Sequence, residues 1–78
     1  MAFEVSIREE TIRLGQLLKL AGLASSGSEA KAMLAREPAW VNGVRDSRRG
    51  RQLRPGDEVR IGEHELLVRS EPRTAARP

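Results

Sequence analysis

The sequence predicts a small α+β domain in which two short helices pack against a mainly antiparallel β-sheet. Three observations lead to this fold class. Apolar residues recur at helical spacing over residues 12–34, whereas they alternate with a period of two over residues 3–7 and again beyond residue 38. Residue pairs that favour tight turns separate the alternating segments. We therefore expect one domain over residues 1–70 and a disordered tail over residues 71–78.

The first two expected elements are a strand and a helix. Residues 3–7 alternate apolar and polar side chains, as in a strand that buries one of its faces. Thr11 can cap a helix over residues 12–21, and Gly22 can end that helix because glycine adopts the left-handed conformation at little cost. The N-terminal part should therefore be a half-buried strand followed by a capped helix.

A second helix is expected between Ser26 and Arg36. Ser26 and Glu29 fit the capping box, in which each side chain accepts a hydrogen bond from the other residue's backbone N–H. Pro38 disfavours helical geometry at the residue before it, so the helix should stop near Arg36. The link between the two helices is short, which predicts a helical hairpin or a right-angled pair.

The remaining expected elements are strands joined by tight turns. Ala39 and Val41 should face one way with Trp40 opposite, and Asn42-Gly43 tolerates the positive φ angles of a two-residue turn. Further along, an Arg-Pro-Gly-Asp sequence predicts a type II turn. The alternating residues over 59–68 then predict an antiparallel hairpin.

Positive charge is concentrated in one arginine-rich segment, residues 45–54. The whole chain carries a net charge of +3, whereas this segment has five arginines against Asp46 and so carries +4. The planar guanidinium fork suits bidentate contacts with phosphate. Clustered like charges repel one another unless an anion neutralises them, which predicts phosphate binding. The alternative is a solvated loop with Asp46 as its internal counter-ion.

The composition argues against catalysis, metal binding and secretion. The chain has one histidine, no cysteine and no tyrosine, so the nucleophile and base pairs of covalent catalysis are hard to assemble. The longest mostly apolar stretch, residues 14–24, is too short to span a bilayer, and the first residues lack the pattern of a signal peptide. We expect a cytoplasmic monomer that is not an enzyme, uses no cofactor or metal and has no membrane partner.

Several separated motifs together resemble the S4 RNA-binding domain. In chain order they are Arg13-Leu14-Gly15-Gln16-Leu17-Leu18, the run from Gly22 to Lys31, Val41-Asn42-Gly43, Arg48-Arg49-Gly50 and Pro55-Gly56-Asp57-Glu58-Val59. The resemblance covers residues 11–62, and the short chain with its extra first strand is similar to the small free-standing bacterial members. It implies two helices in the αL-type arrangement of this family, packed on a small sheet.

The resemblance also implies non-catalytic binding of structured RNA, with ribosomal RNA as the RNA class and ribosomal particles as further partners. Phosphate contacts from the arginine-rich segment and the N-terminal part of the second helix would supply most of the affinity, and RNA shape the selectivity. The expected RNA-binding residues are Arg13, Ser26, Ser28, Lys31, Trp40, Asn42, Gly43, Arg45, Arg48, Arg49 and Arg51.

Some of these residues have a second interpretation. Ser26 has a structural role as a helix cap, and Lys31 can lie on an ordinary solvated helix face. Trp40 can stack on a base or ribose, or it can be partly buried under a helix. For the whole chain, the alternative is a protein-interaction module that docks an acidic partner in ribosome assembly or translation.

Overall fold

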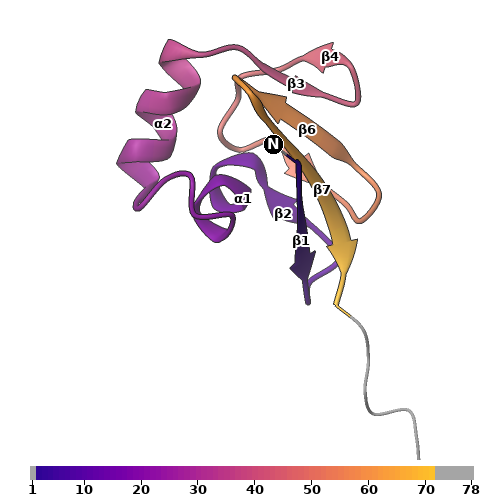
Figure 1. Ribbon diagram of the computed structural model, residues 1–78. Coiled ribbons are helices and arrows are strands. Elements are labelled where there is room, and N and C mark those ends of the chain that lie inside the picture. Colours follow the sequence, from indigo (N-terminus) through magenta and orange to yellow (C-terminus); the bar gives the residue numbers. More distant parts are fainter. Residues whose placement is uncertain (1, 72–78) are drawn as a thin grey trace, which may run out of the picture.

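Two helices lie on one side of a five-stranded sheet in the computed structural model, which describes residues 2–71 (Figure 1). The elements in chain order are β1 (Ala2–Ile7), β2 (Ile12–Arg13), α1 (Leu14–Leu20), α2 (Gly27–Arg36), β3 (Ala39–Val41), β4 (Val44–Arg45), β5 (Gln52–Leu53), β6 (Glu58–Ile61) and β7 (His64–Ser70). This arrangement confirms the predicted α+β fold class.

The main sheet has the strand order β1-β7-β6-β3-β4 and is antiparallel except for one pair. The exception is β1, which runs parallel to β7 with a register from Ala2 opposite Glu65 to Ile7 opposite Ser70. Strands β2 and β5 form a separate two-stranded antiparallel ribbon. The predicted mainly antiparallel sheet and the hairpin of β6 and β7 are therefore confirmed.

A single apolar core fills the space between the helices and the sheet. The buried apolar residues are Val5, Ile7, Ile12, Leu14, Leu17, Leu18, Ala24, Ala30, Met33, Leu34, Ala39, Val41, Leu53, Val59, Ile61, Leu66 and Val68. Full burial of one large apolar side chain contributes about 1.5–3 kcal/mol. No charged or polar residue within residues 2–71 is buried as a whole, so nearly all charges of this part lie at the surface.

Helix α1 begins later than the sequence pattern indicated. Its N-cap is Arg13, and residue Ile12 is extended because it pairs with Leu53 in the β2–β5 ribbon. The buried Ile12 side chain joins the core from this extended backbone. The prediction of Thr11 as the cap of a helix from residue 12 was therefore wrong, because a strand pairing distant in sequence overrides the local helical spacing.

The predicted end of α1 at Gly22 is confirmed. Gly22 has φ +80°, and its N–H donates to the Lys19 carbonyl at 3.0 Å while the Leu23 N–H donates to the Leu18 carbonyl at 3.0 Å. These two hydrogen bonds form a Schellman motif, which satisfies carbonyls at the end of the helix. The short link to α2 follows directly from this turn.

Helix α2 has the predicted cap and the predicted end. The Glu29 N–H donates to the Ser26 hydroxyl oxygen at 3.1 Å, and the helix ends at Arg36. The reciprocal half of the capping box differs, because the Glu29 carboxylate accepts from the N–H and the hydroxyl of Ser25 rather than from Ser26. The backbone hydrogen bond from Ser25 lowers the pKa of Glu29, so this carboxylate is charged at neutral pH.

The predicted turns are also present. Asn42 and Gly43 have φ values of 51° and 83°, as a two-residue turn between β3 and β4 requires. Gly56 has φ +100°, and the Asp57 N–H donates to the Arg54 carbonyl at 3.0 Å, in agreement with a type II turn.

Of the predicted disordered tail, residues 72–78 lie outside the described residues. Glu71 is described: its N–H donates to the Ile7 carbonyl at 2.8 Å. Its carboxylate accepts a hydrogen bond from Arg8 Nε at 3.1 Å. Both contacts continue the pairing of β1 with the end of β7.

Candidate nucleic-acid interface

The arginine loop, defined here as residues 46–51 between β4 and β5, is held by backbone contacts at both ends. The N–H groups of Leu14 and Gly15 donate to the carbonyls of Arg51 and Arg49 at 2.8 and 2.9 Å. The first N–H groups of a helix have no acceptor within the helix, so the loop supplies acceptors that α1 lacks. At its other end, the Asp46 N–H donates to the Ala39 carbonyl at 2.9 Å. The loop is thereby attached to α1 and to β3.

The Arg49 side chain crosses from the start of α1 to the start of α2. Its aliphatic part covers Gly15, where an added Cβ would overlap Arg49 Cγ. Its Nη1 donates to the Gly27 carbonyl at a distance of 3.5 Å. Gly15 is buried, and sequence reasoning missed its role; the only signal was a glycine, a poor helix former, within the first turn of a predicted helix.

Asp46 binds two arginines of the loop at once. Its Oδ1 accepts from the backbone N–H and from Nε of Arg48, both at 3.0 Å, and its Oδ2 accepts from Arg48 Nη2 and Arg51 Nη1, both at 2.8 Å. Asp46 thus acts as an internal counter-ion of the arginine loop, as the alternative interpretation of the sequence expected. It therefore neutralises part of the positive charge of Arg48 and Arg51, and phosphate binding by these two arginines stays a prediction.

The protonation state of Asp46 follows from these contacts. The side-chain hydrogen bond from Arg48, followed by the one from its backbone, holds the pKa of Asp46 well below its usual range. Because the folded-state pKa is depressed, this stabilisation is complete above the ordinary aspartate pKa and is lost only as the pH falls further. At neutral pH, Asp46 is therefore charged.

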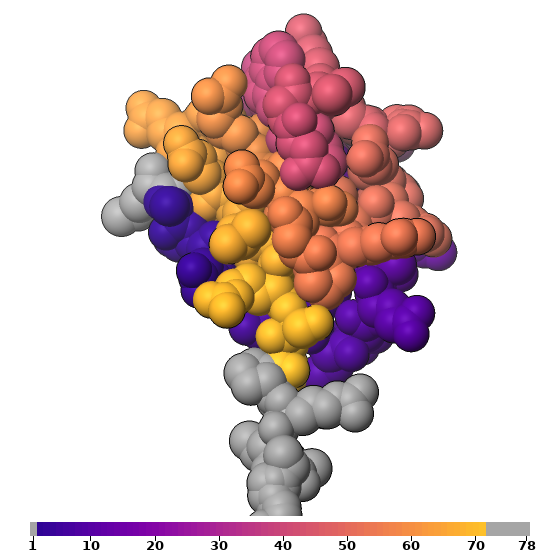
Figure 2. Space-filling view, turned by 90° about the vertical axis from the view of Figure 1, so that its right-hand side faces the viewer, coloured from indigo at the N-terminus to yellow at the C-terminus, as the bar shows by residue number. Residues whose placement is uncertain are grey.

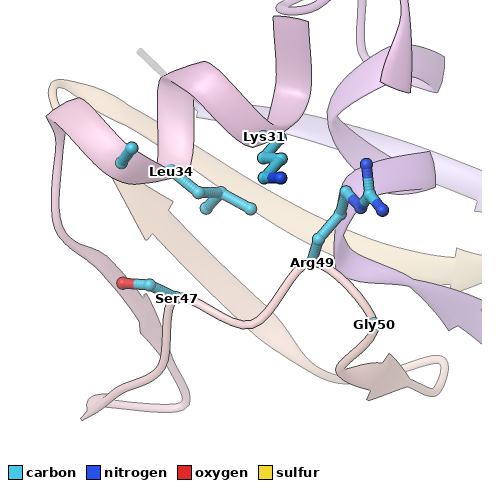
Figure 3. A pocket seen from close by; sticks show the side chains of 6 residues that line it. Lys31, Leu34, Ser47, Arg49 and Gly50 are labelled. Carbon is cyan, nitrogen blue, oxygen red and sulfur yellow. The ribbon is translucent and has the colours of Figure 1, made fainter. Parts of the chain in front are cut away.

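Lys31 and Arg49 face a hollow between α2 and the arginine loop. The hollow has a volume of about 410 Å³ and is lined by Lys31, Leu34, Ala35, Ser47, Arg49 and Gly50. Figure 3 shows the Lys31 and Arg49 side chains reaching into the space between the helix and the loop. Within residues 2–71, neither cation forms a salt bridge with a carboxylate. Two unneutralised positive charges beside an apolar floor can bind an anion.

Trp40 and Arg45 lie on the sheet face that points away from the helices. They are opposite each other in the β3–β4 register, and Trp40 is also opposite Arg60 of β6, whose guanidinium carbon lies 5.9 Å from the centre of the indole ring. Figure 2 shows this side of the molecule, with β1, β7 and β6 visible beside one another. Trp40 is half-buried but not under a helix, because Ala39 and Val41 occupy the inward positions.

Asn42 has a structural role that the sequence did not reveal. Its Nδ2 donates to Asp57 Oδ1 at 3.0 Å, and its Oδ1 accepts from the Glu58 N–H at 2.9 Å. The side-chain amide therefore connects the β3–β4 turn to the turn before β6. The neighbouring Gly43 is exposed and remains accessible to a ligand.

The expected RNA-binding residues are thus distributed over four places. Lys31 and Arg49 meet at the hollow, Arg48 and Arg51 bind Asp46 beside it, and the β3–β4 hairpin residues lie at the edge and outer face of the sheet. Arg13, Ser26 and Ser28 are exposed at the starts of α1 and α2, where Arg13 and Ser26 are the N-caps.

No group of side chains within the described part of the chain has the composition of a metal site. Among residues 2–71, there is also no helix with the length and apolar character needed to cross a membrane.

Comparison with known proteins relates this chain to a family model and to a bacterial protein. A family model described as "S4 domain" matches residues 5–69, which includes both helices and the arginine loop. The chain is also 49% identical over 61 residues to a protein of Bacillus subtilis (strain 168) named "Probable ribosome maturation protein RlbA". The aligned region covers 78% of this chain and 86% of that protein.

The close packing of Arg49 on Gly15 predicts that Gly15→Ala destabilises the protein. The added Cβ would overlap Arg49 Cγ, and overpacking of this kind costs about 1–3 kcal/mol. This cost exceeds the gain of up to about 1 kcal/mol from replacing glycine by alanine in a helix. Urea unfolding measures the resulting free energy change.

Gly27→Ala is the matched control, because Gly27 also lies in the first turn of a helix. There the added Cβ would lie 3.9 Å from Arg49 Nη1, which is an ordinary contact. This variant should be neutral or stabilising. Equal free energies of unfolding for the two variants would contradict the special requirement at Gly15.

Proposed function

This chain belongs to the S4 domain family, and from this premise we propose that it binds structured RNA of the ribosomal class without catalysing a reaction. The name of the Bacillus subtilis relative, which refers to ribosome maturation, supports ribosomal RNA and ribosomal particles as partners. The proposal includes action as a cytoplasmic monomer with no cofactor. The observation that carries the RNA-binding proposal is the pair of cations at the hollow between α2 and the arginine loop.

A phosphate group fits the chemistry of this hollow. Lys31 offers a compact ammonium charge and Arg49 a planar fork of N–H donors, and the two approach from opposite walls. Gly50 has no side chain to obstruct a phosphate, and Leu34 and Ala35 offer apolar contact to a ribose. Contacts of this kind position RNA through its backbone, so selectivity would come from RNA shape.

The remaining candidate residues extend this surface. Arg13 and Ser28 are exposed at the starts of α1 and α2, and the Ser26 hydroxyl caps α2. The chain passes from Ser47, which lines the hollow, back to β4 at the sheet edge. RNA that follows this path around the edge would meet Gly43, Asn42 and Arg45 and then reach Trp40.

The charge of the hollow is tested by Lys31→Gln combined with Arg49→Gln. Glutamine retains most of the aliphatic stems but removes both charges. We expect affinity for purified ribosomal RNA to fall by at least about tenfold, since hydrogen bonds to charged groups contribute about 1.5–3 kcal/mol. The salt dependence should weaken as well, by about 1.4 in the slope of log affinity against log salt concentration. Filter binding at several salt concentrations measures both quantities.

The matched control is Arg8→Gln combined with Lys19→Gln, which removes the same charge outside the hollow. Arg8 forms an exposed salt bridge with Glu71, a type of pair that contributes little to stability. This control should retain most of the affinity. Equal losses in both double variants would show that net charge, rather than the hollow, determines binding.

Trp40 provides a separate test of the outer contact. It is the only tryptophan and the chain has no tyrosine, so intrinsic emission reports on this one position. We expect ribosomal RNA to quench the emission through stacking, and Trp40→Ala to weaken binding with an unchanged salt slope. If ribosomal proteins change the emission and RNA does not, the outer face instead serves the alternative function of a protein-interaction module.

A further inference from the structure

We propose that Asp46 is a positioning residue for RNA binding, which orients Arg48 and Arg51 toward phosphate before the RNA arrives. This inference rests on the proposed function. It extends that function to Asp46, whose negative charge would repel the phosphates of RNA. It assigns to an acidic side chain inside a basic surface a favourable effect on RNA affinity.

The geometry around Asp46 restrains both arginines. Arg48 is held at three points, its backbone N–H, Nε and Nη2, and Arg51 is held through Nη1. The Asp46 side chain is only 8% exposed although the residue lies in a surface loop. Its own position is fixed because its N–H donates to the buried Ala39. The carboxylate is thus a fixed anchor within the loop.

The anchored arginines remain available to a ligand. The Arg48 side chain is 75% exposed while it is paired, and that of Arg51 is 31% exposed. A guanidinium group has five N–H donors, and Asp46 accepts from two on Arg48 and one on Arg51. Each side chain therefore keeps free donors for a phosphate oxygen. Asp46 therefore restricts the orientation of both guanidinium groups but leaves them accessible to a ligand.

Two physical effects of Asp46 on RNA affinity have opposite signs. Its negative charge repels phosphate, so charge alone predicts tighter RNA binding when the charge is removed. Its contacts order two long side chains in advance, and a free arginine must otherwise lose this rotamer freedom on binding. The Asp46 carboxylate contacts two guanidinium groups, so these three side chains together present a net positive charge to phosphate, whereas the ordering cost is unaffected. We therefore infer that the ordering effect is larger.

The test is Asp46→Asn, which retains the shape of the side chain. The NH2 group that replaces one carboxylate oxygen donates hydrogen bonds and cannot accept them. The arginines therefore lose either the contacts with Oδ1 or those with Oδ2, together with the negative charge. We expect affinity for purified ribosomal RNA to fall by roughly tenfold, corresponding to the ordering of two long side chains. The salt slope should not become smaller, because no positive charge has been removed.

Glu10→Gln is the matched control, since it removes one negative charge from an exposed residue outside the loop. It should bind ribosomal RNA as tightly as the wild type or slightly more tightly. Circular dichroism and backbone amide spectra establish that both variants are folded and that Leu14 and Gly15 keep their contacts with the loop.

A measurement on the unmodified chain complements the variant. In the free protein, the Nε–H group of Arg48 should be more ordered and exchange more slowly with water than that of Arg45, for which the described chain has no carboxylate partner. Equal mobility of the two groups would overturn the proposal even if Asp46→Asn fails to fold.

The binding outcomes separate the two proposals. A folded Asp46→Asn variant that binds ribosomal RNA as tightly as the wild type, or more tightly, overturns the positioning role and leaves the proposed function intact. A wild-type chain that does not bind ribosomal RNA even at low salt overturns both.

Discussion

The fold and the candidate site both depend on the contact between the arginine loop and the first turn of α1. Carbonyl groups of Arg49 and Arg51 accept the helix N–H groups that have no partner within the helix. The same contact fixes the backbone from which the Arg49 side chain extends over Gly15 toward α2. The start of α1, Gly15 and Arg49 therefore pack together. The loop backbone that supplies acceptors to the first turn of α1 also holds the Arg49 guanidinium at the hollow between α2 and the arginine loop.

The correctly predicted elements are specified by residues that are close together in the chain. A serine cap and a following proline delimit α2, and Asn42-Gly43 has the backbone freedom that its turn requires. Thr11 was wrongly predicted as a helix cap because of a contact between residues far apart in the chain. Ile12 is extended because it pairs with the distant Leu53. The parallel pairing of β1 with β7 is equally long-range, and no local pattern indicates it.

The sequence located the positive charge of the candidate site but not the partners of that charge. The engagement of Arg48 and Arg51 by Asp46 depends on the shape of the loop, which composition does not specify. Alternation placed Trp40 on the face opposite Ala39, as observed. The proximity of Arg60 to Trp40 could not be predicted, because it depends on the register between β3 and β6, which places these two residues opposite each other.

Phosphate binding in the hollow between α2 and the arginine loop is tested most directly by backbone amide chemical shifts of the isotope-labelled protein during titration with a short ribosomal RNA stem-loop. The largest shifts should occur at Lys31 and over residues 47–50, with little change along β1. Large shifts along β1 and β7, together with an unaffected hollow, would contradict this location of the RNA.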